Sequence, residues 1–304
     1  MRADQGMNIL VTGARGFIGG FLCSALKQSG HRITEVKHKP GGGWVLPVGS
    51  FDVLIHLAAK NSNPGNASIF SEYYEINTVF TERLALEAAH RKVKRLIFLS
   101  TARVSLLESV EPLFPPCSGR QTDPYSLSKL KAEQALKLVA ERTGLPLVIV
   151  RPPIVHGPGV RGNFERLMNL INRGLPLPLG AVNNKRSVVG VDNLVDFLIR
   201  CVEAPYINGH TLTVRDDEDL STPELIQRMA RAMDRRAILW RIPLDWLKFS
   251  SKFFHRTNEI NRLIESLVVD DSRSRELLRW KPKLSLDEGL SRMAIGERGQ
   301  SMAV

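Results

Sequence analysis

Residues 8–28 read NILVTGARGFIGGFLCSALKQ, and this stretch decides the fold. Residues 8–12 form a short apolar run rich in strand-forming residues, which is typical of a buried strand. Glycines then follow at three-residue spacing, and Phe17–Gln28 carries apolar residues at helical spacing. The stretch therefore predicts a strand, a tight turn and a helix in direct succession.

The glycines of the turn are Gly13, Gly16 and Gly19. Without side chains they let the backbone approach a pyrophosphate, and the N-terminus of the following helix faces the negative charge. Three spaced glycines are a weak signal alone, but here they follow a first strand and open a helix, as the mechanism requires. The turn therefore predicts dinucleotide binding.

Further along the chain, short apolar runs alternate with helical patterns. Strands are expected at 31–36, 53–57, 96–99 and 147–150, and helices at 69–90 and 126–143. This alternation predicts an α/β fold with a doubly wound parallel sheet and helices on both faces. After residue 152, prolines and glycines break the regularity, which indicates a second, smaller domain.

The overall composition excludes several protein classes. The chain has 304 residues, 43% hydrophobic and 24% charged, so it can bury a sizeable core and is not a disordered, collagenous or disulfide-stapled protein. It contains no apolar run long enough to cross a bilayer, and the polar N-terminal residues lack a signal-peptide core. We expect a cytoplasmic protein without a membrane span.

Cys23, Cys117 and Cys201 lie far apart, so neither a zinc ribbon nor a disulfide framework is encoded, and no metal site is expected. We expect these thiols to be buried.

The charge is strongly positive, with 42 Lys and Arg against 31 Asp and Glu, or +11. This favours nucleic acid, a membrane surface or a phosphorylated small molecule as partner, and the charge alone does not choose among them. Helices with many arginines and lysines are expected at 223–233 and 244–267. We interpret them as solvated faces that cover a core, with membrane or nucleic-acid contact as the alternative.

The end of the second strand bears on the cofactor. Many dinucleotide folds place a carboxylate there, which binds the ribose hydroxyls and repels a 2′-phosphate. Here Lys37 stands in that place, and Arg15 in the glycine turn adds a second cation. This favours NADP(H) over NAD(H), with simple solvation of both side chains as the alternative.

Four further motifs arrive in order: His56-Leu57-Ala58-Ala59, Ser100-Thr101, Tyr125-Ser126-Leu127-Ser128-Lys129 and Arg151-Pro152-Pro153. With the glycine turn they make the chain resemble an extended short-chain dehydrogenase/reductase of the NAD-dependent epimerase/dehydratase family. The resemblance runs nearly end to end. It implies a Rossmann-type domain formed by residues 1–157 and about 187–203, and a smaller nucleotide-sugar-binding domain formed by 158–186 and 204–304.

The resemblance also implies a set of contacts. It implies a homodimer built by the helices at 69–90 and 126–143. The residues expected to touch the cofactor, beyond Lys37 and the glycines, are Arg15, Phe17, Ile18, Leu57, Ala58, Ala59, Tyr125 and Lys129.

Tyr125 and Lys129 are four residues apart in a helical pattern and share one face. The lysine charge favours the tyrosinate, so that Tyr125 can exchange a proton with a sugar hydroxyl near neutral pH. Thr101 follows the fourth strand, at the edge where such folds place their chemistry, and its hydroxyl can bind the reacting oxygen. The resemblance implies that Lys129 also holds the nicotinamide ribose. The predicted catalytic residues are therefore Thr101, Tyr125 and Lys129.

The expected substrate is a UDP-sugar, through the likeness to UDP-glucose 4-epimerases and reductases of 4-keto UDP-sugars. The resemblance places Asn163 near the base and Arg186 and Arg275 near the pyrophosphate, where guanidinium groups pair with oxygens. His156 replaces a tyrosine of the family and is a candidate substrate contact.

The leading interpretation is reduction of a UDP-4-keto-6-deoxy-(N-acetyl)hexose. The alternative is 4-epimerisation of UDP-glucose or UDP-N-acetylglucosamine. Dehydration is disfavoured because Ala102-Arg103 stands where dehydratases carry an acidic pair. A non-catalytic dinucleotide sensor is disfavoured because the catalytic residues are intact, and no specific nucleic-acid partner is expected.

Overall fold

The computed structural model describes residues 6–37, 43–61, 70–108, 123–247, 260 and 263–301. The chain divides into two compact units, each made of several segments. Unit 1 comprises Met1–Pro152, Val195–Val214 and Asp270–Lys281, and unit 2 comprises Pro153–Leu194, Arg215–Val269 and Pro282–Val304.

Unit 1 is built on a six-stranded sheet in the order β2-β1-β3-β4-β5-β8, in which every neighbouring pair is parallel. The predicted α/β class with a parallel sheet is confirmed. The strands are β1 (Asn8–Thr12), β2 (Arg32–Val36), β3 (Val53–His56), β4 (Leu96–Leu99), β5 (Leu147–Arg151) and β8 (Thr211–Thr213).

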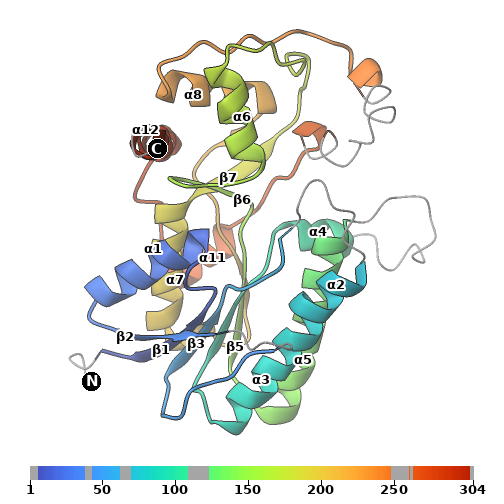
Figure 1. Cartoon of the computed structure of the whole chain (residues 1–304). Helices are drawn as coiled ribbons and strands as arrows, with labels where there is room; N and C mark the ends of the chain where they lie inside the picture. The colour runs from blue at the N-terminus through green and yellow to red at the C-terminus, as the bar shows by residue number, and fades with distance from the viewer. Residues whose placement is uncertain are drawn as a thin grey trace. The chain divides into compact units, whose positions relative to one another are not determined.

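Helices cover both faces of this sheet, with α3 and α5 on one side and α1 and α7 on the other (Figure 1). Strands β3, β4 and β5 are therefore buried along their whole length, as expected for parallel strands covered on both faces. The helices that belong wholly or partly to unit 1 are α1 (Phe17–Gln28), α2 (Phe70–Tyr74), α3 (Phe80–His90), α4 (Arg103–Glu108), α5 (Pro124–Thr143), α7 (Val191–Glu203) and α11 (Ser272–Leu278), with the 3-10 turn η2 at Pro205–Ile207.

The link between β2 and β3 is short, and residues 43–52 add no strand to the sheet, so β2 is its edge. The chain leaves β1 toward β2 on one side and returns to β3 on the other. This reversal places the carboxyl ends of β1 and β3 at the switch point where α/β sheets bind ligands.

The helix expected at 69–90 is present from residue 70, and Ile69 lies outside the described residues. It is not regular, because a π-helical turn, η1 (Glu75–Val79), separates α2 from α3. Such turns carry one extra residue and are frequent at functional sites.

Unit 2 contains a three-stranded sheet in the order β6-β7-β9, with one parallel and one antiparallel pair. Ser221 caps the N-terminus of helix α8 and forms a capping box with Glu224. The elements of this unit are β6 (Ile154–His156), β7 (Arg186–Gly190), β9 (Asp219–Leu220), α6 (Asn163–Asn172), α8 (Thr222–Ala232), α12 (Leu286–Ser301) and the first residues of α7.

The prediction of a continuous helix at 244–267 is wrong at the C-terminal end of that range. Residues 244–247 are helical, while 248–259 and 261–262 lie outside the described residues. Leu267 instead pairs with β7 as an isolated parallel bridge, since Ser187 N donates to Leu267 O at 2.9 Å. Backbone pairing with β7 has replaced the helical hydrogen bonds there.

Three other expectations can be compared with the structure. Cys23 and Cys201 are buried, as expected, and Cys117 lies outside the described residues. β8 and α11 lie in unit 1, although the sequence assigned residues 204–304 to the second domain. Among the described residues, no helix is both long and apolar enough to cross a membrane.

Candidate active site

The glycine turn is packed so closely that two of its positions admit only glycine. Gly13 has φ +70°, and a Cβ there would lie 2.8 Å from Ala58 N. A Cβ on Gly19 would lie 2.0 Å from Gly13 O. The first turn of α1 also has no side-chain cap at Gly16, which leaves backbone N–H groups directed at the turn. This cradle fits the pyrophosphate of a dinucleotide.

The loop after β3 lies directly against this turn. Ala58 N donates to Thr12 Oγ1 at 3.2 Å, and Leu57 N donates to Thr12 O at 3.3 Å. Ala59 follows in the same loop, while Phe17 and Ile18 open α1 and are half-buried. The structure therefore brings together the predicted cofactor residues of the turn and of the 57–59 loop.

The end of β2 carries a carboxylate that the sequence interpretation overlooked. Lys37 is exposed directly after β2, as expected. Arg15 is exposed too, but its Nε lies 3.4 Å from Glu35 Oε2 on β2. The sequence interpretation counted only the two cations, whereas Glu35 also lies here and offsets the charge of Arg15. The alternation of β2 could have suggested it, because Glu35 lies only two residues before Lys37.

His56 joins the turn to α3 from inside the core. Its Nδ1 lies 2.6 Å from Thr12 Oγ1 and its Nε2 2.9 Å from Thr81 Oγ1. Burial, together with the nearby charge of Lys129, lowers the pKa of His56 to about 3. The imidazole is therefore neutral at physiological pH and holds two threonine hydroxyls on opposite sides.

Thr101 follows β4, and contacts on both sides of it hold this segment against α5. Ser100 Oγ donates to Glu133, and Arg103 Nε donates to Ser126 Oγ at 3.3 Å. Tyr125 lies in the first turn of α5 and Lys129 one turn later. The three predicted catalytic residues thus lie on two segments that are bonded to each other, at the carboxyl edge of the sheet.

Lys129 is the most buried cation of this edge, with 1% of its surface exposed. Its Nζ lies 4.0 Å from the centroid of the Phe98 ring, a cation–π arrangement. Burial lowers the pKa of Lys129 to about 7, while the carboxylate of Glu133 acts in the opposite direction. Lys129 can therefore change charge near neutral pH, as a group that tunes a proton-transferring tyrosine should.

The π-helical turn η1 supplies two polar residues that the sequence interpretation missed. Asn77 Oδ1 accepts from Lys60 N at 2.7 Å, and its Nδ2 donates to Ser128 Oγ at 3.0 Å. Thr78 Oγ1 donates to Ser128 O at 2.9 Å. These bonds tie the loop after β3 to α5 beside Lys129. The available signal was two successive polar residues, Asn77 and Thr78, in a segment whose other buried residues are mostly apolar.

A buried ion-pair network supports the same edge. Arg151 Nε donates to Glu133 Oε1 at 3.0 Å, and Arg151 Nη1 donates to Glu108 Oε2 at 2.7 Å. Arg151 and Glu133 are 7% and 1% exposed. Because Glu133 also accepts from Ser100, the network joins β4, β5 and α5 beneath Thr101.

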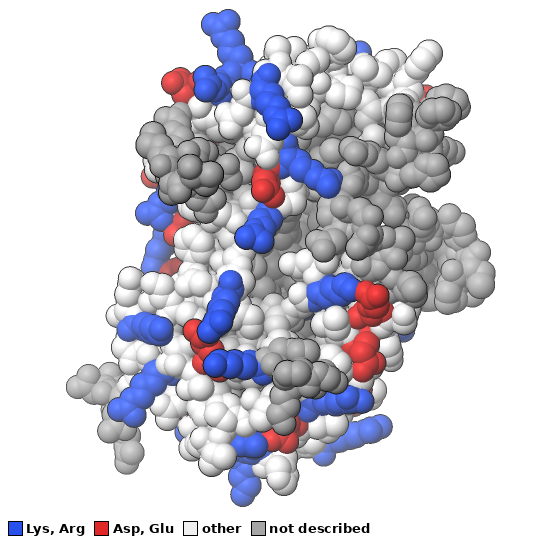
Figure 2. All heavy atoms as spheres, viewed as in Figure 1, with Lys and Arg blue, Asp and Glu red and all other residues white. Residues whose placement is uncertain are grey.

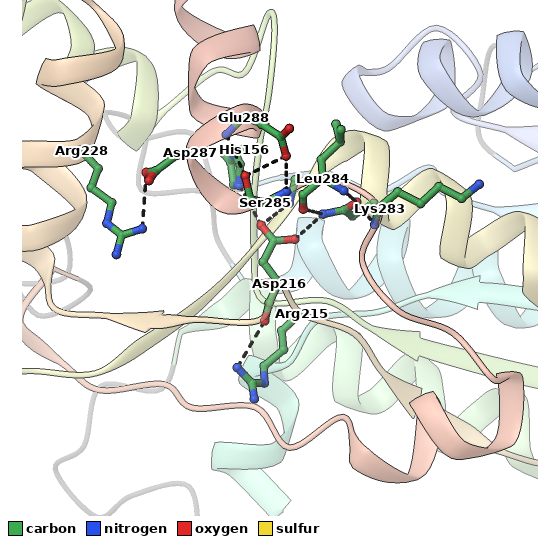
Figure 3. Close-up of polar contacts among 11 residues, drawn as sticks. His156, Arg215, Asp216, Arg228, Lys283, Leu284, Ser285, Asp287 and Glu288 are labelled. Carbon is green, nitrogen blue, oxygen red and sulfur yellow. Dashed lines mark hydrogen bonds and ion pairs between the residues drawn. The ribbon is translucent and has the colours of Figure 1, made fainter.

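The predicted substrate contact His156 has a different place. Its ring has no exposed surface in unit 2, and Nε2 lies 3.1 Å from Asp216 Oδ2 (Figure 3). A Cβ on Gly289 of α12 would lie 2.6 Å from its Cε1. Asp216 also accepts from Asn193 Nδ2 at 2.8 Å. Packing and hydrogen bonding inside unit 2 thus replace the predicted contact, because no ring atom is accessible.

The remaining predicted substrate residues fall in both units. In unit 2, Asn163 begins α6 and is half-buried, and Arg186 begins β7 and is 9% exposed. Arg275 belongs to unit 1, where its Nε lies 2.8 Å from Asp271 Oδ2 and its guanidinium 5.8 Å from the Trp280 ring centroid. These contacts hold Arg275 in place within unit 1. The substrate roles of Asn163, Arg186 and Arg275 stay predictions.

A glycine cradle beside a Thr-Tyr-Lys edge is typical of the short-chain dehydrogenases/reductases. Sequence comparison places the chain in the same class. The chain belongs to the NAD-dependent epimerase/dehydratase family, whose profile matches residues 9–44 and 45–213. The resemblance drawn from the motifs is confirmed.

Individual relatives include both epimerases and reductases. A UDP-glucose 4-epimerase of Vibrio cholerae is 34% identical over 309 residues, covering 94% of each chain. A UDP-2-acetamido-2,6-beta-L-arabino-hexul-4-ose reductase of Pseudomonas aeruginosa is 25% identical, covering 77% of this chain and 59% of that protein. In fold, the chain is similar to UDP-glucuronic acid 4-epimerase of Bacillus cereus solved with NAD, with a TM-score of 0.73, 23% identity, and coverage of 96% and 99% of the two chains.

Proposed function

We propose that this protein is a nucleotide-sugar 4-epimerase that acts on a UDP-sugar. One observation carries the proposal. Lys129 is buried in the same helix, α5, as Tyr125, and α5 is hydrogen-bonded to the segment that holds Thr101. The likeness to the Vibrio cholerae epimerase over nearly the whole of both chains favours epimerisation over net reduction.

The proposed roles follow from the chemistry of the side chains. Tyr125, as tyrosinate, removes the proton of the sugar C4 hydroxyl, and Thr101 donates a hydrogen bond to that oxygen. Lys129 stabilises the tyrosinate through its positive charge. A bound nicotinamide would supply the hydride acceptor and donor at C4. Tyr125 returns the proton once the hydride has been delivered to the opposite face of the sugar.

A second candidate function is net reduction of a UDP-4-keto-6-deoxy-(N-acetyl)hexose. It is favoured by exposed Lys37 at the end of β2, where a cation can bind the 2′-phosphate of NADP(H), the cofactor of most reductive synthesis. Glu35 beside Arg15 weakens this preference and leaves room for NAD(H). The reductase of Pseudomonas aeruginosa supports the same candidate.

We also propose that the protein is a homodimer formed by α3 and α5. These helices lie side by side in unit 1 (Figure 1). Leu86 on α3 and Leu138 on α5 are 46% and 51% exposed, which a partner helix pair would cover.

A nicotinamide absorbance assay separates the candidate functions. The full-length protein is given UDP-glucose or UDP-N-acetylglucosamine with NAD⁺, and in parallel a 4-keto UDP-sugar with NADPH or NADH. We expect the C4 epimers to interconvert with no net change in absorbance. Stoichiometric loss of NADPH with the keto sugar alone identifies the reductase. Cofactor binding without either reaction refutes both enzymes and favours a dinucleotide sensor.

The variant Tyr125→Phe tests the assigned site in the same assay. Loss of the proton-transferring group should lower the rate by about 100-fold or more, while cofactor binding is retained. Tyr206→Phe is the matched control, because Tyr206 is 62% exposed and lies on η2. An active Tyr125→Phe protein rules out the proposed role.

A further inference from the structure

One edge of unit 2 presents large apolar side chains to solvent. Leu177 N donates to Ile238 O at 2.8 Å, and Trp240 N donates to Leu177 O at 2.9 Å, so residues 238–240 are extended along Leu177. In an extended segment alternate residues share a face. Ile238 and Trp240, 45% and 57% exposed, therefore point outward together, while Leu177 is buried.

The same segment continues into a second exposed indole. After α8 the chain runs as an orange coil to a short helix at 244–247 (Figure 1). In that helix Trp246 is 72% exposed, whereas the next residue, Leu247, is 4% exposed. Large contiguous apolar patches on a folded protein mark interaction surfaces. Ile238 and Trp240 share one exposed face, and Trp246 follows in the same segment of the chain. We name residues 235–246 the tryptophan edge.

The tryptophan edge is basic. Arg235, Arg236 and Arg241 are exposed within it, against the exposed carboxylate of Asp245. Lys and Arg side chains are spread over the visible face of the molecule rather than confined to one place (Figure 2). Charge alone therefore does not distinguish this edge; the combination of arginines with two exposed indoles does.

We propose that the tryptophan edge binds an anionic membrane surface. Indole rings favour the boundary between lipid headgroups and acyl chains, and arginines pair with lipid phosphates. A second copy of the same edge is a poor occupant, because two basic surfaces repel each other. A nucleic acid satisfies the arginines but offers no apolar medium to Ile238. The binding is peripheral, with the apolar side chains at the interface and the rest of unit 2 in water.

Vesicle binding by the full-length protein tests the proposal. Co-sedimentation is measured with vesicles of phosphatidylcholine alone and with added phosphatidylglycerol, together with quenching of tryptophan fluorescence by brominated lipids. We expect binding that requires the anionic lipid and is weakened by salt, with quenching. Trp240→Ser/Trp246→Ser should abolish the quenching, and Arg235→Gln/Arg236→Gln should weaken binding by about tenfold or more.

Tyr206→Ser is the matched control, because Tyr206 is a similarly exposed aromatic residue that lies in unit 1. The Tyr206→Ser protein should bind vesicles as the wild type does. Absence of binding to anionic vesicles overturns the proposal, as does unchanged binding and quenching in the double tryptophan variant. Tighter binding to single-stranded RNA than to vesicles, lost with the same indoles, overturns it in favour of a nucleic-acid surface. Loss of self-association in the tryptophan variant overturns it in favour of an interface between copies.

Discussion

At the scale of single residues, buried ionisable groups govern how unit 1 responds to pH. His56 and Lys129 have pKa values of about 3 and about 7, both lowered chiefly by burial. Each therefore binds fewer protons in the folded chain than in the unfolded chain over the interval between its two pKa values. Stability consequently rises with pH through each interval, from about 3 to 6.5 for His56 and from about 7 to 10.5 for Lys129.

We predict that the variant His56→Gln loses part of the acid sensitivity of the protein. Below pH 6.5 the unfolded wild-type chain takes up a proton at His56 that the folded chain refuses. This costs up to about 1.4 kcal/mol per pH unit. The free energy of unfolding, measured in urea between pH 7 and pH 4.5, should fall less steeply in the variant, although the variant is less stable at pH 7. Equal slopes would show that His56 accepts a proton in the folded state.

At the scale of elements, the sequence predicted the helices and strands that have a clear local periodicity of apolar residues. The expected helix at 17–28 and strand at 96–99 coincide with α1 and β4. β8 was missed because three residues carry too little pattern. The turn η1 was missed because its bonds are made to α5, about 50 residues away, by Asn77 and Thr78.

In the candidate site too, some residues were predictable from local sequence signals, and others gain their roles only from contacts made in the fold. Glycine spacing and the Tyr125–Lys129 interval are local signals and were readable from the sequence. Glu35 and Glu133 have roles only through partners that the fold brings near, Arg15 and Arg151. His156 was misplaced because its position in a motif says nothing about burial.

The network that joins β4, β5 and α5 carries a prediction about stability. Arg151→Met leaves the carboxylate of Glu133 buried without its cation and should cost about 3–5 kcal/mol of unfolding free energy. Glu108→Gln removes a partner that is 42% exposed and should cost about 1 kcal/mol or less. Urea unfolding measures both, and similar losses for the two variants would contradict the buried network.

At the scale of the whole molecule, the two units are interleaved along the chain. The chain passes between them after Pro152, Leu194, Val214, Val269 and Lys281, and α7 contributes residues to both. Local sequence patterns do not reveal such returns, because the residues of α11 look like any short helix until their contacts with β8 are known.

The proposed homodimer gives a prediction at the same scale. Leu86→Glu/Leu138→Glu places two carboxylates per copy where α3 and α5 would meet their partners, so the variant should sediment as a monomer. A matched variant, Val48→Glu, changes a residue that is 95% exposed outside these helices and should leave the dimer intact. A wild-type protein that sediments as a monomer at micromolar concentration would contradict the proposed dimer.

The π-helical turn η1 implies a trade between local helix quality and function. Deleting one residue from Glu75–Val79 would let α2 run into α3 as a single regular helix with better backbone hydrogen bonds. The same deletion would rotate either Asn77 and Thr78 or the residues before them by about 100° around the axis, away from Lys60 and Ser128. The turn therefore gives up regular helical hydrogen bonds locally and in exchange keeps Asn77 and Thr78 bonded to the loop after β3 and to α5.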